Sequence, residues 1–80
     1  MHVAVELSLY PLADEFIPPI LDFIERLKAR PGIAVSTNSM STQVSGDLDA
    51  VFEALRAEMA RSFTGGRRSV FVMKVLGGAD

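Results

Sequence analysis

The sequence predicts an α+β sandwich, in which two helices pack on one face of a four-stranded antiparallel sheet. Three observations lead to this prediction. Apolar and polar residues alternate near the N-terminus with the period of a strand, two later segments repeat apolar residues with the period of a helix, and a mostly apolar run comes near the end. The length of 80 residues predicts one domain, 1–80, with the order strand, helix, strand, strand, helix, strand.

The first strand is predicted over residues 3–10. One face would carry Val3, Val5, Leu7 and Leu9, and the other Ala4, Glu6, Ser8 and Tyr10. This period of two is that of a half-buried strand. Pro11 has no N–H to donate to a neighbouring strand, so we expect it to end the segment.

The first helix is expected after an irregular turn. Asp14 and Glu15 lie where its positive end begins, and the prolines at 18–19 are tolerated only in a first turn. Regular helix should therefore start at residue 17 or 18, and the sequence RPG at 30–32 should stop it. Its predicted apolar face contains Ile17, Ile20, Leu21, Ile24 and Leu27.

A hairpin and the second helix are predicted next. The segments IAVSTN (33–38) and STQVSG (41–46) are expected to pair, with Ser39 and Met40 at the turn. Asp47 is a favourable N-cap for the helix that follows. The predicted apolar stripe of that helix contains Leu48, Val51, Phe52, Leu55, Met59 and Phe63.

The segment TGGRR (64–68) is predicted as a turn, and SVFVMKVL (69–76) as the last strand. With right-handed crossovers, this order of elements is that of the ferredoxin-like fold. That fold places the first and third strands in the centre of the sheet and both helices on one side. The other side, called the open face below, would have no cover from this chain.

The alternation assigns side chains to the two sides of the sheet. The helix side is expected to receive Val3, Val5, Leu7, Leu9, Ile33, Val35, Val44, Phe71, Met73 and Val75. The open face is expected to receive Glu6, Ser8, Tyr10, Ser36, Asn38, Gln43, Ser45, Val70, Val72 and Lys74. Lys74 is placed there because a buried unpaired ammonium is costly, and because Glu6 would give it a partner. Such a mixed face is typical of a solvated surface, a subunit interface or a small-molecule pocket.

Composition limits the classes of partner. The chain is 49% apolar and 22% charged, but it is small and has no cysteine for disulfides or thiolate metal sites. We therefore expect a homodimer or homotetramer. The net charge of −2 argues against binding nucleic acid. No apolar run has the length of a membrane span and the N-terminus lacks the pattern of a signal peptide, so a cytoplasmic location is expected.

The sequence offers little catalytic chemistry. His2 is the only histidine, and no set of histidines or carboxylates has the spacing of metal ligands, so neither a metal nor a cofactor is expected. The segment GGRR (65–68) could bind an anion, but without a strand-to-helix phosphate loop a solvated turn is the preferred interpretation. A cofactor-independent enzyme would need a buried acid or base, and Glu6 is the one candidate.

Two segments carry a resemblance to a known family. ELSLYPL (6–12), together with STQVSGDLDAVFEALR (41–56), resembles the YkoF-like family of thiamine- and hydroxymethylpyrimidine-binding proteins. The resemblance covers essentially the whole chain. Because the chain has no internal repeat, it resembles the short form that oligomerises. The resemblance implies binding of thiamine or its pyrimidine half without catalysis.

The resemblance and the open face together predict a pocket on that face of an oligomer. Its expected ligand-binding residues are Glu6, Ser8, Tyr10, Asn38, Met40 and Thr42. Amide and hydroxyl groups would form hydrogen bonds with the edge of a pyrimidine, and Tyr10 and Met40 would contact its flat face. Glu6 could face the thiazolium, although an ion pair with Lys74 is the preferred interpretation, and the pattern equally allows Thr42 to point inward.

Two further expectations concern the ligand and the function. The lack of a phosphate-binding motif favours an unphosphorylated ligand over the diphosphate. The alternative function is a structural or regulatory oligomer, in which the polar sheet face is only a subunit interface.

Overall fold

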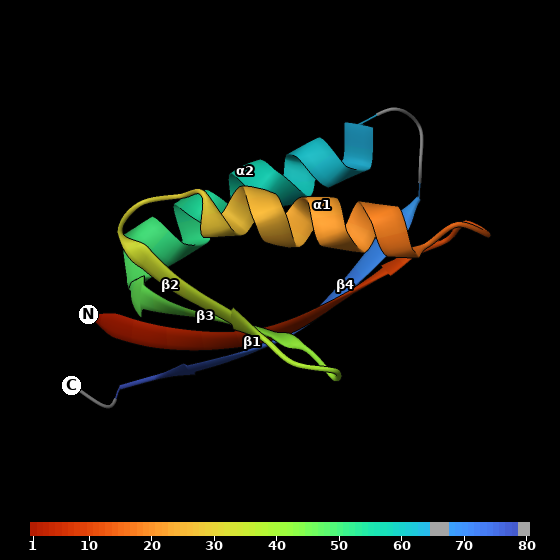
Figure 1. The fold of residues 1–80 in the computed structure, drawn as a ribbon. Coiled ribbons are helices and arrows are strands. Elements are labelled where there is room, and N and C mark those ends of the chain that lie inside the picture. Colours follow the sequence, from red (N-terminus) through yellow and green to blue (C-terminus); the bar gives the residue numbers. More distant parts are fainter. Residues whose placement is uncertain (65–67, 79–80) are drawn as a thin grey trace.

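The computed structural model describes residues 1–64 and 68–78, and it contains the predicted succession of elements (Figure 1). The elements are β1 (His2–Pro11), α1 (Ile17–Lys28), β2 (Ile33–Thr37), β3 (Thr42–Asp47), α2 (Leu48–Phe63) and β4 (Ser69–Gly77). β2 ends one residue earlier than its predicted segment, β3 begins and ends one residue later than its own, and Pro11 is the last residue of β1.

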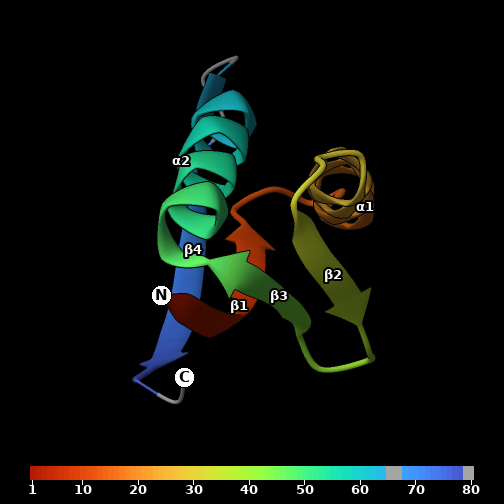
Figure 2. The same ribbon diagram turned by 90° about the vertical axis from the view of Figure 1, so that its left-hand side faces the viewer.

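The four strands form one antiparallel sheet in the order β2-β3-β1-β4. The central positions of β1 and β3 confirm the predicted ferredoxin-like topology. Both helices lie on the same side of the sheet, with α2 on the β4 side and α1 on the β2 side (Figures 1 and 2). The opposite side is the open face, which neither helix covers.

The hydrophobic core lies between the sheet and the helices. It contains Val3, Val5, Leu7, Leu9, Phe23, Leu27, Val44, Val51, Ala54 and Leu55. The four alternating residues of β1 are each less than 9% exposed. The predicted inward face of the first strand is therefore confirmed.

The buried face of α1 differs from the predicted one. Phe23 is 1% exposed and packs against Phe71 with ring centroids 5.0 Å apart, whereas Ile17 and Leu21 are 51% and 57% exposed. Residues 20, 23, 24 and 27 satisfy helical spacing as well as the predicted set does. Packing on the sheet selects between the two faces, and the prediction for Ile17 and Leu21 is wrong.

The buried stripe of α2 is also shifted from the prediction. Phe52 and Phe63 are 36% and 49% exposed, although both were predicted to face the core. Ala54 and Glu58 are buried instead, at 2% and 3% exposure. The apolar pattern does not predict that the carboxylate of Glu58 is buried. The charged groups around it explain why this is tolerated.

Glu58 joins the two helices through charged hydrogen bonds, an arrangement called the Glu58 clamp below. Its carboxylate accepts from Nη1 of Arg26 at 3.1 Å and from Nε of Arg30 at 2.9 Å, both on or just beyond α1. Arg61 approaches to 3.9 Å, and Arg26 also donates to Ser62 at 2.8 Å. Every charge in this cluster thus has an opposite partner, which is the condition under which a buried carboxylate is tolerated.

The three residues of the last strand that were predicted to point inward all pair with inward residues of β1, but only two of them pack against the core. Phe71 and Met73 pack against the core, whereas Val75 is 49% exposed although it pairs with the buried Val5. Because β4 lies at the edge of the sheet, Val75 has a strand neighbour on one side only. Val75 therefore lies on the predicted side of the sheet, but it is not buried.

The helix ends follow the sequence closely. Pro18 and Pro19 lie in the first turn of α1, but no acidic residue does, because Asp14 and Glu15 precede the helix. Asp47 caps α2 by accepting from the backbone N–H of Asp49 at 3.1 Å, as predicted. The N-terminal ammonium, hydrogen-bonded at 3.2 Å, and that N–H hold the pKa of Asp47 below its usual value.

Three residues of the predicted 64–68 turn, and with them most of the GGRR segment, lie outside the described residues. Within the described ranges, α1 and α2 lack the length and hydrophobicity of a membrane span.

Candidate functional site

Strand β1 extends beyond its neighbour β3. The pairing of β1 with β3 ends where Leu7 meets Thr42, whereas its pairing with β4 continues to Pro11 and Ser69. The last four residues of β1 therefore have a strand on one side only. In residues 1–64 and 68–78, alternate backbone N–H and C=O groups of this stretch face a gap instead of a strand.

A cavity of about 580 Å³ occupies this gap and is called the hairpin-tip cavity below. It lies between the end of β1, the N-terminal half of α1 and the β2–β3 turn. Its lining consists of Leu7, Ser8, Leu9, Tyr10, Pro11, Phe16, Ile20, Leu21, Ile24, Thr37, Asn38, Ser39, Met40, Ser41 and Thr42. The walls are mostly apolar, the hydroxyls and the amide come mainly from the turn, and no lining side chain is charged.

Five of the six predicted ligand-binding residues line this one cavity: Ser8, Tyr10, Asn38, Met40 and Thr42. The sixth, Glu6, lies elsewhere on the sheet. Much of the apolar wall was not among the predicted residues, because it comes from Phe16 and from three residues of α1, Ile20, Leu21 and Ile24. The only sequence signal for that wall was an excess of apolar residues in α1 beyond what one buried face requires.

Thr42 lies on the helix side of the sheet, which is the inward alternative that the sequence left open. It pairs with Leu7 and is 6% exposed. Its hydroxyl lies 3.3 Å from the hydroxyl of Thr37, and either oxygen can donate. The pair forms a small polar spot in an otherwise apolar wall.

Asn38 is a turn residue, because β2 ends at Thr37, and the prediction of an open-face strand residue is wrong. Its side-chain oxygen accepts from the backbone N–H groups of Met40 at 2.8 Å and of Ser41 at 2.9 Å. The backbone N–H of Asn38 donates to the carbonyl of Ser41 at 3.0 Å. The side-chain carbonyl therefore holds the hairpin tip in shape, which leaves its amide NH₂ as the group able to donate to a ligand.

The mouth of the cavity carries side chains with flat or adaptable surfaces. Tyr10 is 54% exposed, Met40 is 84% exposed, and Phe16, which lines the same cavity, is 50% exposed. Ser8 bridges the gap with a long hydrogen bond of 3.4 Å from its hydroxyl to the carbonyl of Met40. A bond of this length is weak, so the hydroxyl can turn toward another partner.

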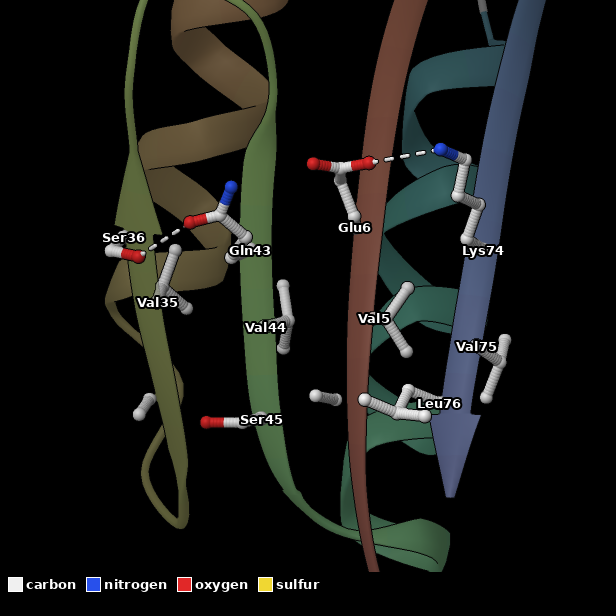
Figure 3. Close-up of a pocket in the computed structure, with 12 residues that line it drawn as sticks. Val5, Glu6, Val35, Ser36, Gln43, Val44, Ser45, Lys74, Val75 and Leu76 are labelled. Atoms are coloured by element: carbon white, nitrogen blue, oxygen red, sulfur yellow. Dashed lines mark hydrogen bonds and ion pairs between the residues drawn. The ribbon is translucent and has the colours of Figure 1, made fainter.

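The open face has a smaller hollow of about 470 Å³, shown in Figure 3. Its polar members lie on the face to which the alternation assigned them: Glu6, Ser36, Gln43, Ser45 and Lys74. In Figure 3, Lys74 reaches across the face toward Glu6 on the neighbouring strand.

Glu6 already has partners within the chain. Its carboxylate lies 3.7 Å from Nζ of Lys74 and accepts from the hydroxyl of Ser41 at 3.1 Å. The preferred ion pair is thus present within a single chain. In the described residues, no group of three or more His, Cys, Asp or Glu side chains is arranged to hold a metal ion.

A family model described as "YKOF-related Family" matches residues 2–72. The chain belongs to the YKOF-related family. This confirms the resemblance seen in the sequence. The search of curated proteins finds no match.

Solved structures with the same fold come from several organisms. The hypothetical protein MJ1052 of Methanocaldococcus jannaschii is 27% identical with a TM-score of 0.83, over 99% of this chain and 82% of that one. A protein of Thermotoga maritima, TM0486, carries the name "putative thiamine biosynthesis/salvage protein"; it is 16% identical with a TM-score of 0.86, over 99% and 86%. Protein SP2199 of Streptococcus pneumoniae is 18% identical with a TM-score of 0.89, over 98% and 88%. The last two likenesses concern the fold alone.

Proposed function

We propose that this protein binds thiamine or its hydroxymethylpyrimidine half, without catalysis, in the hairpin-tip cavity. The observation that carries the proposal is the convergence of Ser8, Tyr10, Asn38, Met40 and Thr42 on one uncharged, largely apolar cavity in a member of the YKOF-related family. The name of the Thermotoga maritima protein of the same fold, with its reference to thiamine biosynthesis or salvage, supports the same class of ligand.

The dimensions and surface of the cavity suit a flat heterocycle. A volume of about 580 Å³ is within the range of roughly 300–1,000 Å³ that small-molecule sites occupy. Tyr10 and Phe16 offer ring faces, and Met40 offers a polarisable side chain that adapts to a ring. The aliphatic wall behind them excludes water from the ring.

The polar groups match the edge of an aminopyrimidine. Such an edge presents an amino donor beside a ring-nitrogen acceptor, which is complementary to a peptide C=O beside an N–H. The unpaired backbone edge of β1 after Leu7 supplies this pair of groups. The Asn38 amide and the Ser8 hydroxyl are within the same lining and add a donor and a donor–acceptor.

The electrostatics favour an uncharged or weakly charged ligand over a phosphate ester. No Lys or Arg lines the cavity, so a diphosphate buried there would lack a counter-charge. Glu6 would not neutralise the thiazolium of thiamine, because it lines the other hollow and is paired with Lys74. The pyrimidine half is therefore expected to provide most of the binding energy.

Thermal denaturation with thiamine, hydroxymethylpyrimidine and thiamine diphosphate tests the proposal. A ligand present at 100 times its Kd should add about 2.7 kcal/mol of stability, which raises the Tm of so small a domain by roughly 10–20 °C. We expect shifts with the first two compounds and little with the diphosphate. No shift with any of them would contradict the proposal and favour the alternative of a structural oligomer.

Two variants locate the site. Tyr10→Ala removes a half-exposed ring from the cavity mouth and should abolish most of the ligand-induced shift with little change in the Tm of the free protein. Ala34→Lys is the matched control, because Ala34 lies in the open-face hollow and not in the cavity. A shift that survives Tyr10→Ala but is lost in Ala34→Lys would assign the ligand to the open face.

A further inference from the structure

The hairpin tip, residues 38–41, forms one wall of the hairpin-tip cavity and lies beyond the paired part of the sheet. The pairing of β2 with β3 begins only where Thr37 meets Thr42. Asn38 folds the tip on itself by accepting from the N–H groups of Met40 and Ser41. These bonds fix the shape of the tip, but they do not fix its position relative to β1 on the other side of the cavity.

Two side-chain hydrogen bonds join the tip to β1 in the described part of the chain. The Ser8 hydroxyl donates to the carbonyl of Met40 at 3.4 Å, and both groups are neutral. The Ser41 hydroxyl donates to Oε2 of Glu6 at 3.1 Å. Hydrogen bonds to a carboxylate are shorter and stronger than those between neutral groups. Glu6 therefore provides the stronger of the two connections.

Glu6 and Ser41 are both held in orientation by a further neighbour. The Oε1 atom of Glu6 lies 3.7 Å from Nζ of Lys74, and in Figure 3 its two oxygens point to opposite sides of β1. The side-chain amide of Gln43 donates to the Ser41 hydroxyl at 3.3 Å. That hydroxyl thus accepts from Gln43 and uses its single proton for Glu6.

Ser41 connects Glu6 to the residues that line the cavity. Its carbonyl accepts from the N–H of Asn38 at 3.0 Å and from the hydroxyl of Thr37 at 3.4 Å. A displacement of Ser41 would disturb these bonds, and Asn38 and Met40 would move with it. Glu6 is not part of the cavity lining, so it can affect the site only through such contacts.

We infer that Glu6 is a positioning residue, which acts from outside the cavity and through Ser41 to hold the hairpin tip where it forms the cavity mouth. The consequence for ligand affinity rests on the proposed function. Without this bond the mouth would be formed in only a fraction of the molecules, and the apparent affinity falls in proportion to that fraction. Loss of one hydrogen bond should weaken binding on the order of fivefold, which corresponds to ~1 kcal/mol.

NMR relaxation of the backbone amides tests the positioning without any ligand. Glu6→Leu removes the acceptor, and Lys74→Met is the matched control because it removes the other partner of Glu6 and keeps the Ser41 bond. Order parameters of Met40 and Ser41 should stay near the rigid value of ~0.85 in the wild type and in Lys74→Met, and fall below ~0.6 in Glu6→Leu. Unchanged values in Glu6→Leu, or an equal decrease in Lys74→Met, would overturn the inference.

Calorimetric titration with thiamine and with hydroxymethylpyrimidine tests the consequence for affinity. Glu6→Leu should raise the Kd on the order of fivefold, whereas Glu6→Gln keeps an acceptor oxygen for Ser41 and should restore a Kd close to that of the wild type. Equal losses in the two variants would contradict a positioning role. A wild type that binds neither compound would contradict the proposed function alone, and the order parameters would still decide this inference.

A double-mutant cycle shows whether Glu6 acts through Ser41. Ser41→Ala should raise the Kd as much as Glu6→Leu does, and the double variant should raise it no further, because both changes remove the same bond. Fold-changes that multiply in the double variant would show that the two side chains act separately and would overturn the inference. The Glu6 side chain is 47% exposed, so circular dichroism should show each variant folded.

Discussion

The Glu58 clamp allows a quantitative test of what holds the two helices together. Glu58→Gln keeps the shape of the side chain but removes the charge that Arg26 and Arg30 share. The Arg26 side chain is only 13% exposed, so its guanidinium would stay in a poorly solvated position with the exposed Asp22 as its remaining counter-charge. Removing one partner of a buried pair costs about 3–5 kcal/mol.

That cost is large for a chain of this size. At ~0.05–0.15 kcal/mol per residue, 80 residues give a total stability of about 4–12 kcal/mol. With a change of ~4–8 °C per kcal/mol, the Tm should fall by at least about 12 °C. Thermal and urea denaturation followed by circular dichroism measure the loss, and the urea midpoint should fall while the slope stays constant.

Two companion variants show whether the charge itself is responsible. Glu53→Gln changes an exposed carboxylate on the same helix and should alter the free energy of unfolding by no more than about 0.5 kcal/mol. A combined variant that replaces Glu58, Arg26 and Arg30 with apolar residues of similar volume should recover most of the stability, because the charges that lose a partner, on Asp22 and Arg61, are exposed and no buried charge is left unpaired. A Tm decrease below about 4 °C for Glu58→Gln would refute the reasoning.

Four further predictions concern local features. Asn38→Ala should lower the free energy of unfolding by about 1–2 kcal/mol, since two backbone N–H groups lose their acceptor. Asn38→Asp keeps an acceptor oxygen and should leave this free energy unchanged, so equal losses for the two variants in urea denaturation would contradict the prediction. Gly46→Ala should cost more than about 1 kcal/mol in the same assay, because φ is +152° and the new Cβ would lie 3.1 Å from the Gly32 carbonyl oxygen. The pKa of Asp47 is lower in the folded than in the unfolded protein, so its ionised form adds stability above the unfolded pKa of about 4, and this stability is lost as the pH falls through the folded pKa. Asp47→Asn should therefore flatten the dependence of Tm on pH below about 4. Lys74→Met should change the free energy of unfolding by less than about 1 kcal/mol, because its ion pair with Glu6 is exposed; a larger loss by thermal denaturation would show that the pair carries more energy than its exposure implies.

The sequence predicts the sheet more accurately than the helix faces. The period of two in β1 fixes which residues point inward, and the cap at Asp47 fixes where α2 begins. In α1, by contrast, the sets 17-20-21-24 and 20-23-24-27 satisfy the same helical period, and only packing against Phe71 shows that Phe23 is buried. The burial of Glu58 cannot be predicted from a local pattern, because its partners Arg26 and Arg30 lie 32 and 28 residues away in the sequence.

For the candidate site, the sequence identifies the neighbourhood but not the side of the sheet. Residues at the end of β1 and in the hairpin turn do converge, but on a gap that opens because β3 stops at Thr42 while β1 continues. That difference in length depends on the turn held by Asn38, which the residue pattern treated as strand. The α1 wall of the cavity depends on how the helix packs, so it could not be located from periodicity.

The wall of the hairpin-tip cavity is also part of the hydrophobic core. Leu7, Leu9 and Ile24 are buried hydrophobic residues and also line this cavity. A ligand bound in the cavity would pack against these core residues as an additional buried side chain would. A substitution in this wall that alters ligand specificity would therefore also alter the free energy of unfolding. The ligand specificity of the protein can change only within the limits that the stability of an 80-residue chain sets.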